Sequence, residues 1–376
     1  MKSYTILHCP YNWAGNPGNL ARAERKIGLQ SWSVDFGKNT YTFQSDELIG
    51  NEKFLVREYK RWILLLKILF RFDVVHFNAG STLMPDWSIE EKYTYPIYKK
   101  IHSFYIRLFI LKDLFLLKIF KKGIVVTFQG DDARQGDYCK RYFRITFANE
   151  VSAHYYSPSQ ETFKKLKIKM FEKYANKIYA LNPDLLYILP KRAHFLPYTH
   201  VNMDEWQPSY SPSIKGRAIT IVHAPTDRII KGTKYIIEAI EKLKKEGYPI
   251  QFVLVENMAN ESAKEIYKKA DILIDQLLAG WYGGLAVELM ALGKPVIAYI
   301  REEDLKFIPT KMKDELPVIN ATPDTIYRVL KKYITVDKNK LVSIGKKSRQ
   351  FVERWHDPIR IAKRLKRDYE KIMKKN

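Results

Sequence analysis

The sequence contains few cysteines and no long apolar run. Only two cysteines, Cys9 and Cys139, occur among 376 residues, and they stand far apart in no metal-like spacing. We therefore expect neither a disulfide framework nor a zinc site, and a reducing cytoplasm fits best. The most apolar stretch, residues 104–120, is interrupted by Lys, Arg and Asp, so no membrane-spanning helix is expected. The opening residues MKSYTILHCPYNW lack the apolar region of a signal peptide.

Acidic residues are scarce relative to basic ones. Lys and Arg number 64 against 41 Asp and Glu, which gives a formal net charge of +23. Such an excess favours phosphate-rich partners: nucleic acid, an anionic lipid surface or a phosphorylated substrate. It also fits a soluble protein with a generally basic surface. Because the sequence contains no RRM-like, zinc-finger or helix-turn-helix pattern, nucleic acid is not the partner we expect.

Strand and helix patterns alternate along the whole chain. The strand candidates are SYTILHC, SWSVDFG, VVHFNA and GIVVTFQ in the first half, then AITIVHAP, PIQFVLVE, ADILIDQL and PVIAYI. This alternation predicts an α/β fold with parallel sheets, and the length suits two domains. A Pro/Ser/Gly-rich segment without periodicity, residues 207–216, is the best linker candidate. We expect one domain over residues 1–205, a second over 206–356, and a basic helix over 357–376.

The segment GWYGGLAVELMALGKPV, residues 280–296, carries the strongest site signal. Gly283 and Gly284 lack a Cβ, so a ligand can approach the backbone closely where a helix begins. The unpaired N–H groups of a helix N-terminus suit a diphosphate. Glu288 lies on an apolar stripe of this helix and needs partners, which a ribose diol would supply. The competing interpretation is an ordinary helix whose glutamate pairs with a neighbouring lysine.

The segment HAPTDRIIKGT, residues 223–233, follows a strand and opens a helix. Arg228 and Lys231 therefore lie where side chains reach a ligand at the carboxyl end of a strand. Two cations at this place suit a diphosphate leaving group whose charge grows during the reaction. A solvated loop with incidental charges is the competing interpretation.

Two features of the first half leave more than one interpretation open. The loop WAGNPGN places Gly15 and Gly18 between a strand and a helix, but GxxG is an incomplete dinucleotide fingerprint and also fits a plain structural turn. The segments WILLLKILFRF and FYIRLFILKDLFLLKIFKK combine large apolar residues with Lys and Arg. They fit either helices packed on the sheet or helices lying on an anionic membrane surface.

Residues 217–300 resemble the C-terminal domain of the GT-B glycosyltransferases of family 4, the group-1 type. The resemblance rests on the Arg-and-Lys loop before the KGT helix, the strand ADILID, and the Gly-rich turn leading to VELMALGKPV. The first half is similar more loosely, through its early Gly loop, DVVHFN and VVTFQGDD. The resemblance implies two Rossmann-like domains facing an interdomain cleft, with a last helix that returns to the N-terminal domain.

The family's reaction implies the partners. We expect sugar transfer from a UDP- or GDP-linked donor to a glycan or lipid-linked acceptor, by a hexosyl-type enzyme of polysaccharide biosynthesis. The family retains anomeric configuration and needs no metal or other cofactor. The protein would be cytoplasmic, or peripheral on the inner face of the cell membrane.

The resemblance also implies roles for single residues of the second half. Arg228 and Lys231 would hold the donor phosphates and Glu288 the ribose hydroxyls, so these three are the candidate catalytic residues. The backbone of Gly283, Gly284 and Leu285 would lie along the donor sugar and diphosphate. The sequence departs from the family at Gly280, where a second glutamate is expected eight positions before Glu288. Asp275, at the end of the preceding strand, is the candidate substitute.

Roles in the first half follow in the same way. The Gly15–Gly18 loop would close over the donor phosphates. Gln129 is a candidate donor-binding residue. It stands where the family often has a histidine; Gln donates hydrogen bonds but exchanges no proton near neutral pH, so a general base is not expected there. Asp131 and Asp132 are candidates for sugar contacts. Two other functions stay open: a nucleotide-sugar epimerase of GT-B fold and a DNA-binding or DNA-glycosylating protein.

Overall fold

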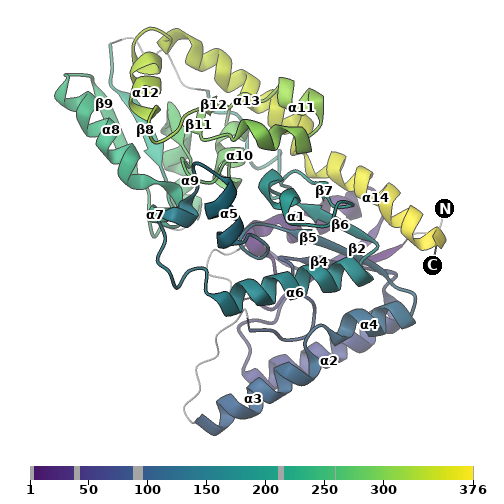
Figure 1. The fold of residues 1–376 in the computed structure, drawn as a ribbon. Helices are drawn as coiled ribbons and strands as arrows, with labels where there is room; N and C mark the ends of the chain where they lie inside the picture. Colours follow the sequence, from purple (N-terminus) through teal and green to yellow (C-terminus); the bar gives the residue numbers. More distant parts are fainter. Residues whose placement is uncertain (1–3, 38–42, 88–95, 211–215, 259, 376) are drawn as a thin grey trace. The chain divides into compact units, whose positions relative to one another are not determined.

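The chain forms two compact units. The structure, a computed structural model, describes residues 4–37, 43–87, 96–210, 216–258 and 260–375. Unit 1 comprises Met1–Arg134, Thr162–His200 and Pro358–Asn376, and unit 2 comprises Gln135–Glu161 and Val201–Asp357 (Figure 1). Part of the expected linker, residues 211–215, lies outside the described residues.

Unit 1 is built on a parallel sheet of seven strands in the order β3-β2-β1-β4-β5-β6-β7. Its strands are β1 (Thr5–Cys9), β2 (Gln30–Asp35), β3 (Glu47–Leu48), β4 (Val74–Asn78), β5 (Gly123–Phe128), β6 (Lys177–Ala180) and β7 (His194–Phe195). The four strands expected in the first half are confirmed. The other three contain two to four residues each, too few to show an apolar period.

Most helices of unit 1 connect these strands, and the last one follows unit 2 in the chain. They are α1 (Asn16–Lys26), α2 (Phe54–Arg71), α3 (Pro96–Phe109), α4 (Lys112–Ile119), α6 (Pro158–Tyr174) and α14 (Pro358–Lys375). Short 3-10 helices occupy η1 (Trp13–Gly15) and η3 (Pro183–Tyr187). The helical region expected over 91–122 divides into α3 and α4, because Leu111 adopts a left-handed conformation with φ 59°. Residues 91–95 of that region lie outside the described part.

The two faces of this sheet differ in polarity, because successive side chains of a strand point to opposite faces. One face carries Leu7, Val75 and Val126, and packs against buried side chains of α2, α4 and α6. The other face carries His8 and His76, both fully buried, beneath α1 and α14.

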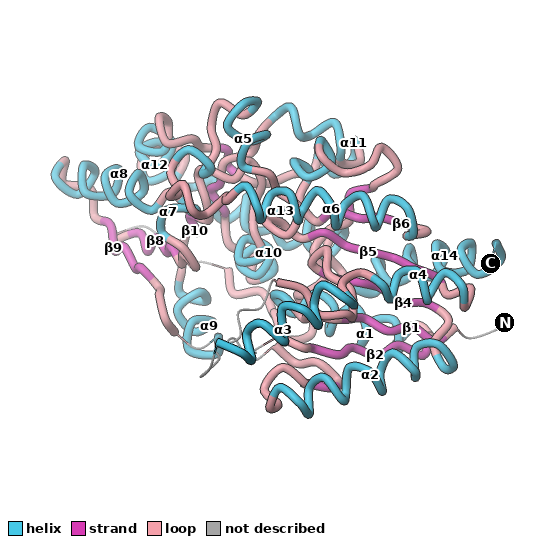
Figure 2. The backbone as a smooth tube through the Cα atoms, turned by 60° about the horizontal axis from the view of Figure 1, so that its bottom comes forward, coloured by secondary structure: helices cyan, strands magenta, loops and turns pink. Residues whose placement is uncertain are grey.

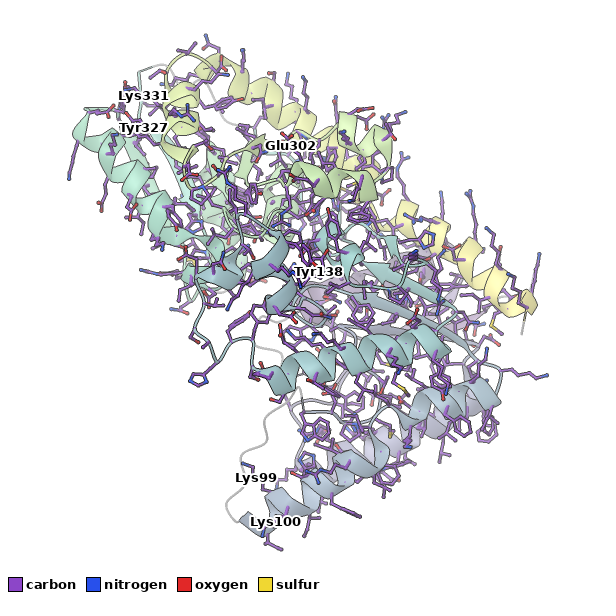
Figure 3. The ribbon with its side chains drawn as sticks, viewed as in Figure 1. Lys99, Lys100, Tyr138, Glu302, Tyr327 and Lys331 are labelled. Atoms are coloured by element: carbon purple, nitrogen blue, oxygen red, sulfur yellow. The ribbon has the colours of Figure 1, made fainter. Side chains whose placement is uncertain are left out.

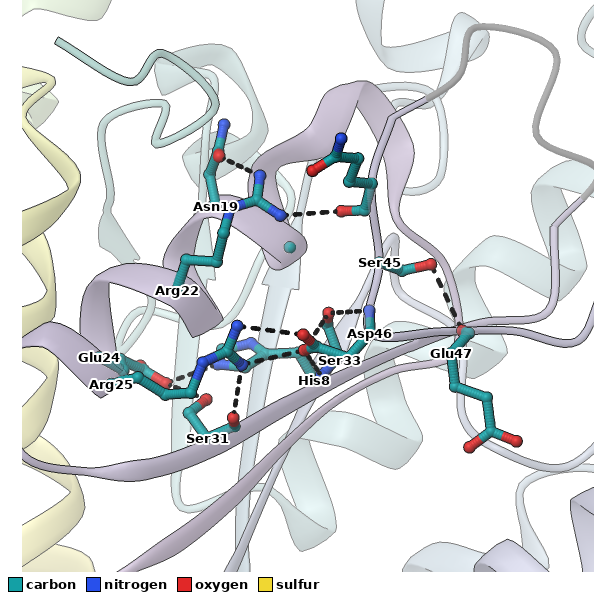
Figure 4. Close-up of polar contacts among 12 residues, drawn as sticks. His8, Asn19, Arg22, Glu24, Arg25, Ser31, Ser33, Ser45, Asp46 and Glu47 are labelled. Carbon is teal, nitrogen blue, oxygen red and sulfur yellow. Dashed lines mark hydrogen bonds and ion pairs between the residues drawn. The ribbon is translucent and has the colours of Figure 1, made fainter. Parts of the chain in front are cut away.

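The buried polar face binds the last helix to the first. Glu24 of α1 accepts a hydrogen bond from Tyr369 of α14 (3.0 Å) and lies 2.8 Å from Nε2 of His8. Figure 4 shows Glu24 beside His8 and Ser31. Because the Tyr369 hydroxyl donates to Glu24, Nδ1 of His76, 2.8 Å away, must donate to Tyr369. Burial lowers the pKa of His76 well below its usual value, so the imidazole is neutral. Helix α14 is therefore an integral part of unit 1.

Unit 2 contains a parallel sheet of five strands in the order β12-β11-β10-β8-β9. Its strands are β8 (Ile219–His223), β9 (Ile250–Leu254), β10 (Ile272–Ile274), β11 (Val296–Ala298) and β12 (Ile319–Asn320). Its helices are α5 (Gly136–Tyr142), α7 (Arg228–Lys231), α8 (Thr233–Lys245), α9 (Asn260–Lys269), α10 (Gly284–Ala291), α11 (Thr310–Asp314), α12 (Ile326–Ile334) and α13 (Leu341–Trp355), with 3-10 turns η2 (Phe147–Asn149), η4 (Glu302–Phe307) and η5 (Lys338–Lys340). The four strands expected in the second half are confirmed, and so is the α/β class.

Residues 135–161 belong to unit 2, although the sequence pattern predicts them in the first domain, over residues 1–205. Glu150 accepts hydrogen bonds from Lys234 and Tyr235 of α8, each at 2.6 Å. The guanidinium of Arg301 lies 3.6 Å from the ring centroid of Phe143 and donates to a backbone carbonyl of the same segment. These partners are about 85 to 160 positions away in sequence, so no local pattern reveals them.

Among the helices that the structure describes, none combines the length and apolar character needed to cross a bilayer.

Candidate functional site

Lys231 lies at the carboxyl edge of the unit 2 sheet. Strands β8 and β10 are parallel neighbours, so their carboxyl ends share this edge. Asp227 caps the short helix α7 by accepting hydrogen bonds from two backbone N–H groups, and Gly232, with φ 74°, ends the helix. Nζ of Lys231 then donates to Oδ1 of Asp275 (2.9 Å) and Oε1 of Gln276 (2.7 Å), both just beyond β10.

Asp275 joins this lysine to the N-terminus of α10. Its carboxylate is buried, and Oδ2 accepts a hydrogen bond from the backbone N–H of Gly283 at 2.6 Å. A Cβ at Gly283 would lie 3.1 Å from Nζ of Lys231 and 3.2 Å from Asp275, so glycine allows the close approach. The ammonium group of Lys231, the N-terminus of α10 and the buried carboxylate of Asp275 thus lie next to one another. Lys231 and the helix N-terminus could bind an anion there if the carboxylate of Asp275 moves away from them.

Arg228 is bound to a different carboxylate. Its guanidinium makes two hydrogen bonds to Glu256, at 2.8 and 2.5 Å, and its side chain is 58% exposed. Glu256 lies just beyond β9, the neighbour of β8. The structure therefore divides the two predicted phosphate-binding cations between two carboxylates, Arg228 with Glu256 and Lys231 with Asp275.

Glu288 is a partly buried carboxyl group on α10. Burial raises its pKa to about 7, and the negative charge of Asp275 adds to this, while Lys264 opposes it. At neutral pH, Glu288 is accordingly present in both protonated and ionised forms. In the ionised form it can accept two hydrogen bonds from a diol, as the sequence analysis expects.

Gly280, where the family that the sequence resembles carries a second glutamate, lies against a guanidinium. Its φ is 80°, and a Cβ built there would come within 2.6 Å of Cζ of Arg301. Arg301 is buried, pairs with buried Asp304 at 2.9 Å and lies over the ring of Phe143. A positive group thus lies beside the backbone from which the family's carboxylate would extend.

His223 ends β8 but serves the fold. Its Nδ1 lies 2.8 Å from the carbonyl of Ile274, which can only accept, so Nδ1 carries the proton. Nε2 then accepts from Thr233 at 2.8 Å. Burial lowers the pKa of His223 to about 4, so the ring is neutral and joins β8 to β10 and α8.

In the glycine loop of unit 1, close packing leaves no room for a side chain at Gly15 or Gly18. Gly15 has φ 71°, and a Cβ there would meet the ring of Phe43 at 2.9 Å. A Cβ at Gly18 would come within 2.3 Å of the carbonyl oxygen of Gln44. The side chain of Asn12 accepts from the N–H of Gly18 at 2.9 Å and so fixes this turn. A role in donor binding at these glycines stays a prediction.

The residues after β5 divide into structural carboxylates and one amide. Asp132 accepts hydrogen bonds from the backbone N–H groups of Gln129 (3.0 Å) and Gly130 (2.6 Å), and burial raises its pKa. Asp131 pairs with Arg134 at 2.6 Å. Nε2 of Gln129 is buried and makes no hydrogen bond to any residue that the structure describes. Of the three candidates, Gln129 is therefore the one whose side chain retains a donor for a ligand.

Sequence reasoning missed three residues of the unit 2 site: Glu256, Gln276 and Arg301. The first two each stand two residues beyond a strand, a position that itself points to the carboxyl edge of a parallel sheet. Arg301 follows β11 in the same way, but its place over Gly280 depends on chain folding. Within the described residues, no group of three or more His, Cys, Asp or Glu side chains could hold a metal ion.

Comparisons with known proteins agree on the fold. No protein-family model and no curated protein sequence matches the chain. Among solved structures, sucrose-phosphate synthase from Thermosynechococcus elongatus is similar with a TM-score of 0.58 and 13% identity over 100% of both chains. Anabaena HepE in complex with UDP-glucose has a TM-score of 0.56 and 10% identity, over 98% of this chain and 100% of that one. An α-glucosyltransferase in complex with UDP-glucose and DNA has a TM-score of 0.58 and 12% identity, over 99% and 100%. The GT-B fold expected from the sequence is confirmed.

Proposed function

We propose that this chain is a glycosyltransferase of family 4 that moves a hexosyl group from a nucleotide-sugar donor to a glycan or lipid-linked acceptor. The observation that carries the proposal is the convergence of Nζ of Lys231, the carboxylate of Asp275 and the N–H of Gly283 at the carboxyl edge of the unit 2 sheet. Ligands of open α/β sheets bind beyond the carboxyl ends of the strands. UDP-glucose is present in two solved structures of the same fold.

The chemistry assigns a role to each group. As the bond from the anomeric carbon to the diphosphate breaks, negative charge grows on the leaving group. Lys231 and the N-terminus of α10 would stabilise that charge. Ionised Glu288 would accept hydrogen bonds from the ribose. Arg228 would contribute only after releasing Glu256, so we assign it a smaller part than Lys231. Retention of configuration and independence from metal are parts of this proposal, and addition of EDTA should leave the rate unchanged.

Donor binding measured by calorimetry tests the site. We expect one of a panel of UDP-, GDP- and ADP-sugars to bind the wild type and raise its melting temperature. Lys231→Met should weaken that binding by roughly 10- to 150-fold, because a charge-assisted hydrogen bond contributes about 1.5–3 kcal/mol. Lys245→Met is the matched control. It removes the same charge from the exposed far end of α8, away from the carboxyl edge, and should leave binding unchanged.

Product analysis then tests the reaction. Transfer of the sugar to a glycan or lipid-linked acceptor supports the proposal. Inversion at a sugar carbon without an acceptor would instead assign epimerase chemistry, and sugar appearing on duplex DNA would assign DNA glycosylation. Equal donor affinity for wild type and Lys231→Met would show that the anion binds elsewhere.

A further inference from the structure

Helices α2, α3 and α4 form an outer layer of unit 1 (Figures 1 and 2). Aromatic contacts hold the layer together. The rings of Phe54 and His102 are 5.0 Å apart, and those of Trp62 and Phe109 are 4.8 Å apart, so α3 runs beside α2. The rings of Phe70 and Phe120 are 6.0 Å apart, which places the end of α4 beside the end of α2. The inner side of α2 and α4 is occupied by core residues. The outer side therefore faces away from the sheet.

The outer side of each helix carries an apolar stripe. On α3, Ile97, Ile101, Phe104 and Leu108 follow the i, i+4, i+7, i+11 spacing of one helix face, and each is more than half exposed.

Matching stripes occur on the other two helices. On α2 the stripe contains Leu55, Tyr59, Leu66 and Phe70, and on α4 it contains Phe115 and Ile119, again each more than half exposed. The described residues include 22 exposed large apolar side chains. Of these, 11 lie on α2, α3 or α4, and a twelfth, Phe120, directly follows α4. Single exposed apolar residues are normal on a protein surface, but this concentration marks an interaction surface.

Every exposed charge on these helices is positive. The two acidic residues of α2, α3 and α4 are buried: Glu58 is bound by Arg61 and Tyr105, and Asp113 by backbone N–H groups. The exposed charged residues are Lys67, Arg71, Lys99, Lys100, Arg107, Lys112 and Lys118. Figure 3 labels Lys99 and Lys100 near the first turn of α3. The surface thus joins apolar stripes to cations of one sign.

We propose that this face of α2, α3 and α4 docks on an anionic lipid bilayer. Its apolar stripes would enter the boundary between headgroups and acyl chains, while the lysines and arginines contact lipid phosphates. Charge decides between this partner and a second copy of the chain. A twofold contact brings the same patch against itself and would oppose its positive charges, whereas an anionic bilayer complements them. This inference does not depend on the sugar-transfer reaction.

Sedimentation with vesicles tests the proposal without any variant. The wild type should bind vesicles of phosphatidylglycerol and phosphatidylcholine mixed, and bind far less to phosphatidylcholine alone. Raising NaCl from 0.05 to 0.5 M should release most of the bound protein, because salt screens the cations. No binding to the anionic vesicles at low salt would overturn the proposal.

Two variants and their controls locate the surface. Lys99→Gln, Lys100→Gln and Arg107→Gln combined should weaken vesicle binding by about 100-fold, since each near-surface cation contributes about fivefold. Lys244→Gln, Lys245→Gln and Lys346→Gln combined remove the same charge from exposed positions of unit 2 and should have little effect.

Apolar substitutions provide the second arm. Phe70→Ser, Phe104→Ser and Phe115→Ser combined should weaken vesicle binding by at least about tenfold, with donor binding unchanged. Leu166→Ser and Val336→Ser, at exposed apolar positions elsewhere, should leave vesicle binding unchanged. Equal losses in surface and control variants would overturn the assignment. So would a dimer, seen by analytical ultracentrifugation, that the three Phe→Ser changes abolish, because the surface would then belong to a second copy.

Discussion

Replacing Gly280 with alanine should destabilise unit 2 more than the same change at a comparable glycine. Two costs add. The backbone has φ 80°, where an L-residue is less stable than glycine by about 1–2 kcal/mol. The new methyl would also lie within 2.6 Å of Cζ of Arg301, and such overpacking costs about 1–3 kcal/mol. We therefore expect a total loss of about 2–5 kcal/mol.

Gly247 provides the matched control. Its φ is 86°, and a Cβ built there meets no atom within 4 Å, so Gly247→Ala should lose only about 1–2 kcal/mol. Urea denaturation followed by circular dichroism measures both free energies of unfolding. In a background of Arg301→Ala the steric cost disappears, and Gly280→Ala should then cost no more than Gly247→Ala. Equal losses for the two alanine variants with Arg301 present would refute the packing of Arg301 on Gly280.

Three further predictions address the carboxyl groups and the last helix. The pKa of Glu288 is raised to about 7, and ribose binding needs the ionised form. The donor affinity of the wild type should therefore fall as the pH drops below 7, by up to about tenfold per pH unit. Calorimetry between pH 6 and 8 should show that Glu288→Gln binds the donor weakly and with almost no dependence on pH. Asp275→Asn removes a charge that raises the pKa of Glu288, so the midpoint of the same pH dependence should move to lower pH, and an unmoved midpoint would contradict the coupling. Tyr369→Phe leaves buried Glu24 and His76 without a shared hydroxyl and should lower the stability of unit 1 by roughly 1–3 kcal/mol in urea denaturation, whereas Tyr142→Phe, at an exposed ring, should not.

The proposed site differs in its charges from the family that the sequence resembles. The family's second glutamate would extend from position 280, but here the guanidinium of Arg301 lies beside that backbone. The buried carboxylate of Asp304 pairs with Arg301, so this position carries a compensated cation where the resembled family carries a negative charge. Asp275 supplies a carboxylate nearby, but it is bound to Lys231 and Gly283.

The amino-acid sequence by itself determined the elements of local order. The alternation of apolar runs and helical periods predicted eight of the strands and two parallel layers, because such periods reflect which face of an element is buried. It also marked the glycine turn at Gly283, Lys231 in the segment that follows β8, and Asp275 just beyond β10, since all strands of a parallel sheet end at the same edge.

Only the tertiary structure decided which distant groups meet. In the structure, Arg228 binds Glu256 and Arg301 lies against Gly280. Residues 135–161 belong to unit 2. The second apolar side of α2 and the apolar stripe of α3 are exposed. The spacing of apolar residues shows that a helix is apolar on two sides, but it does not show which side packs against the rest of the protein. The choice depends on contacts between residues far apart in the chain, and one sequence contains no local trace of them.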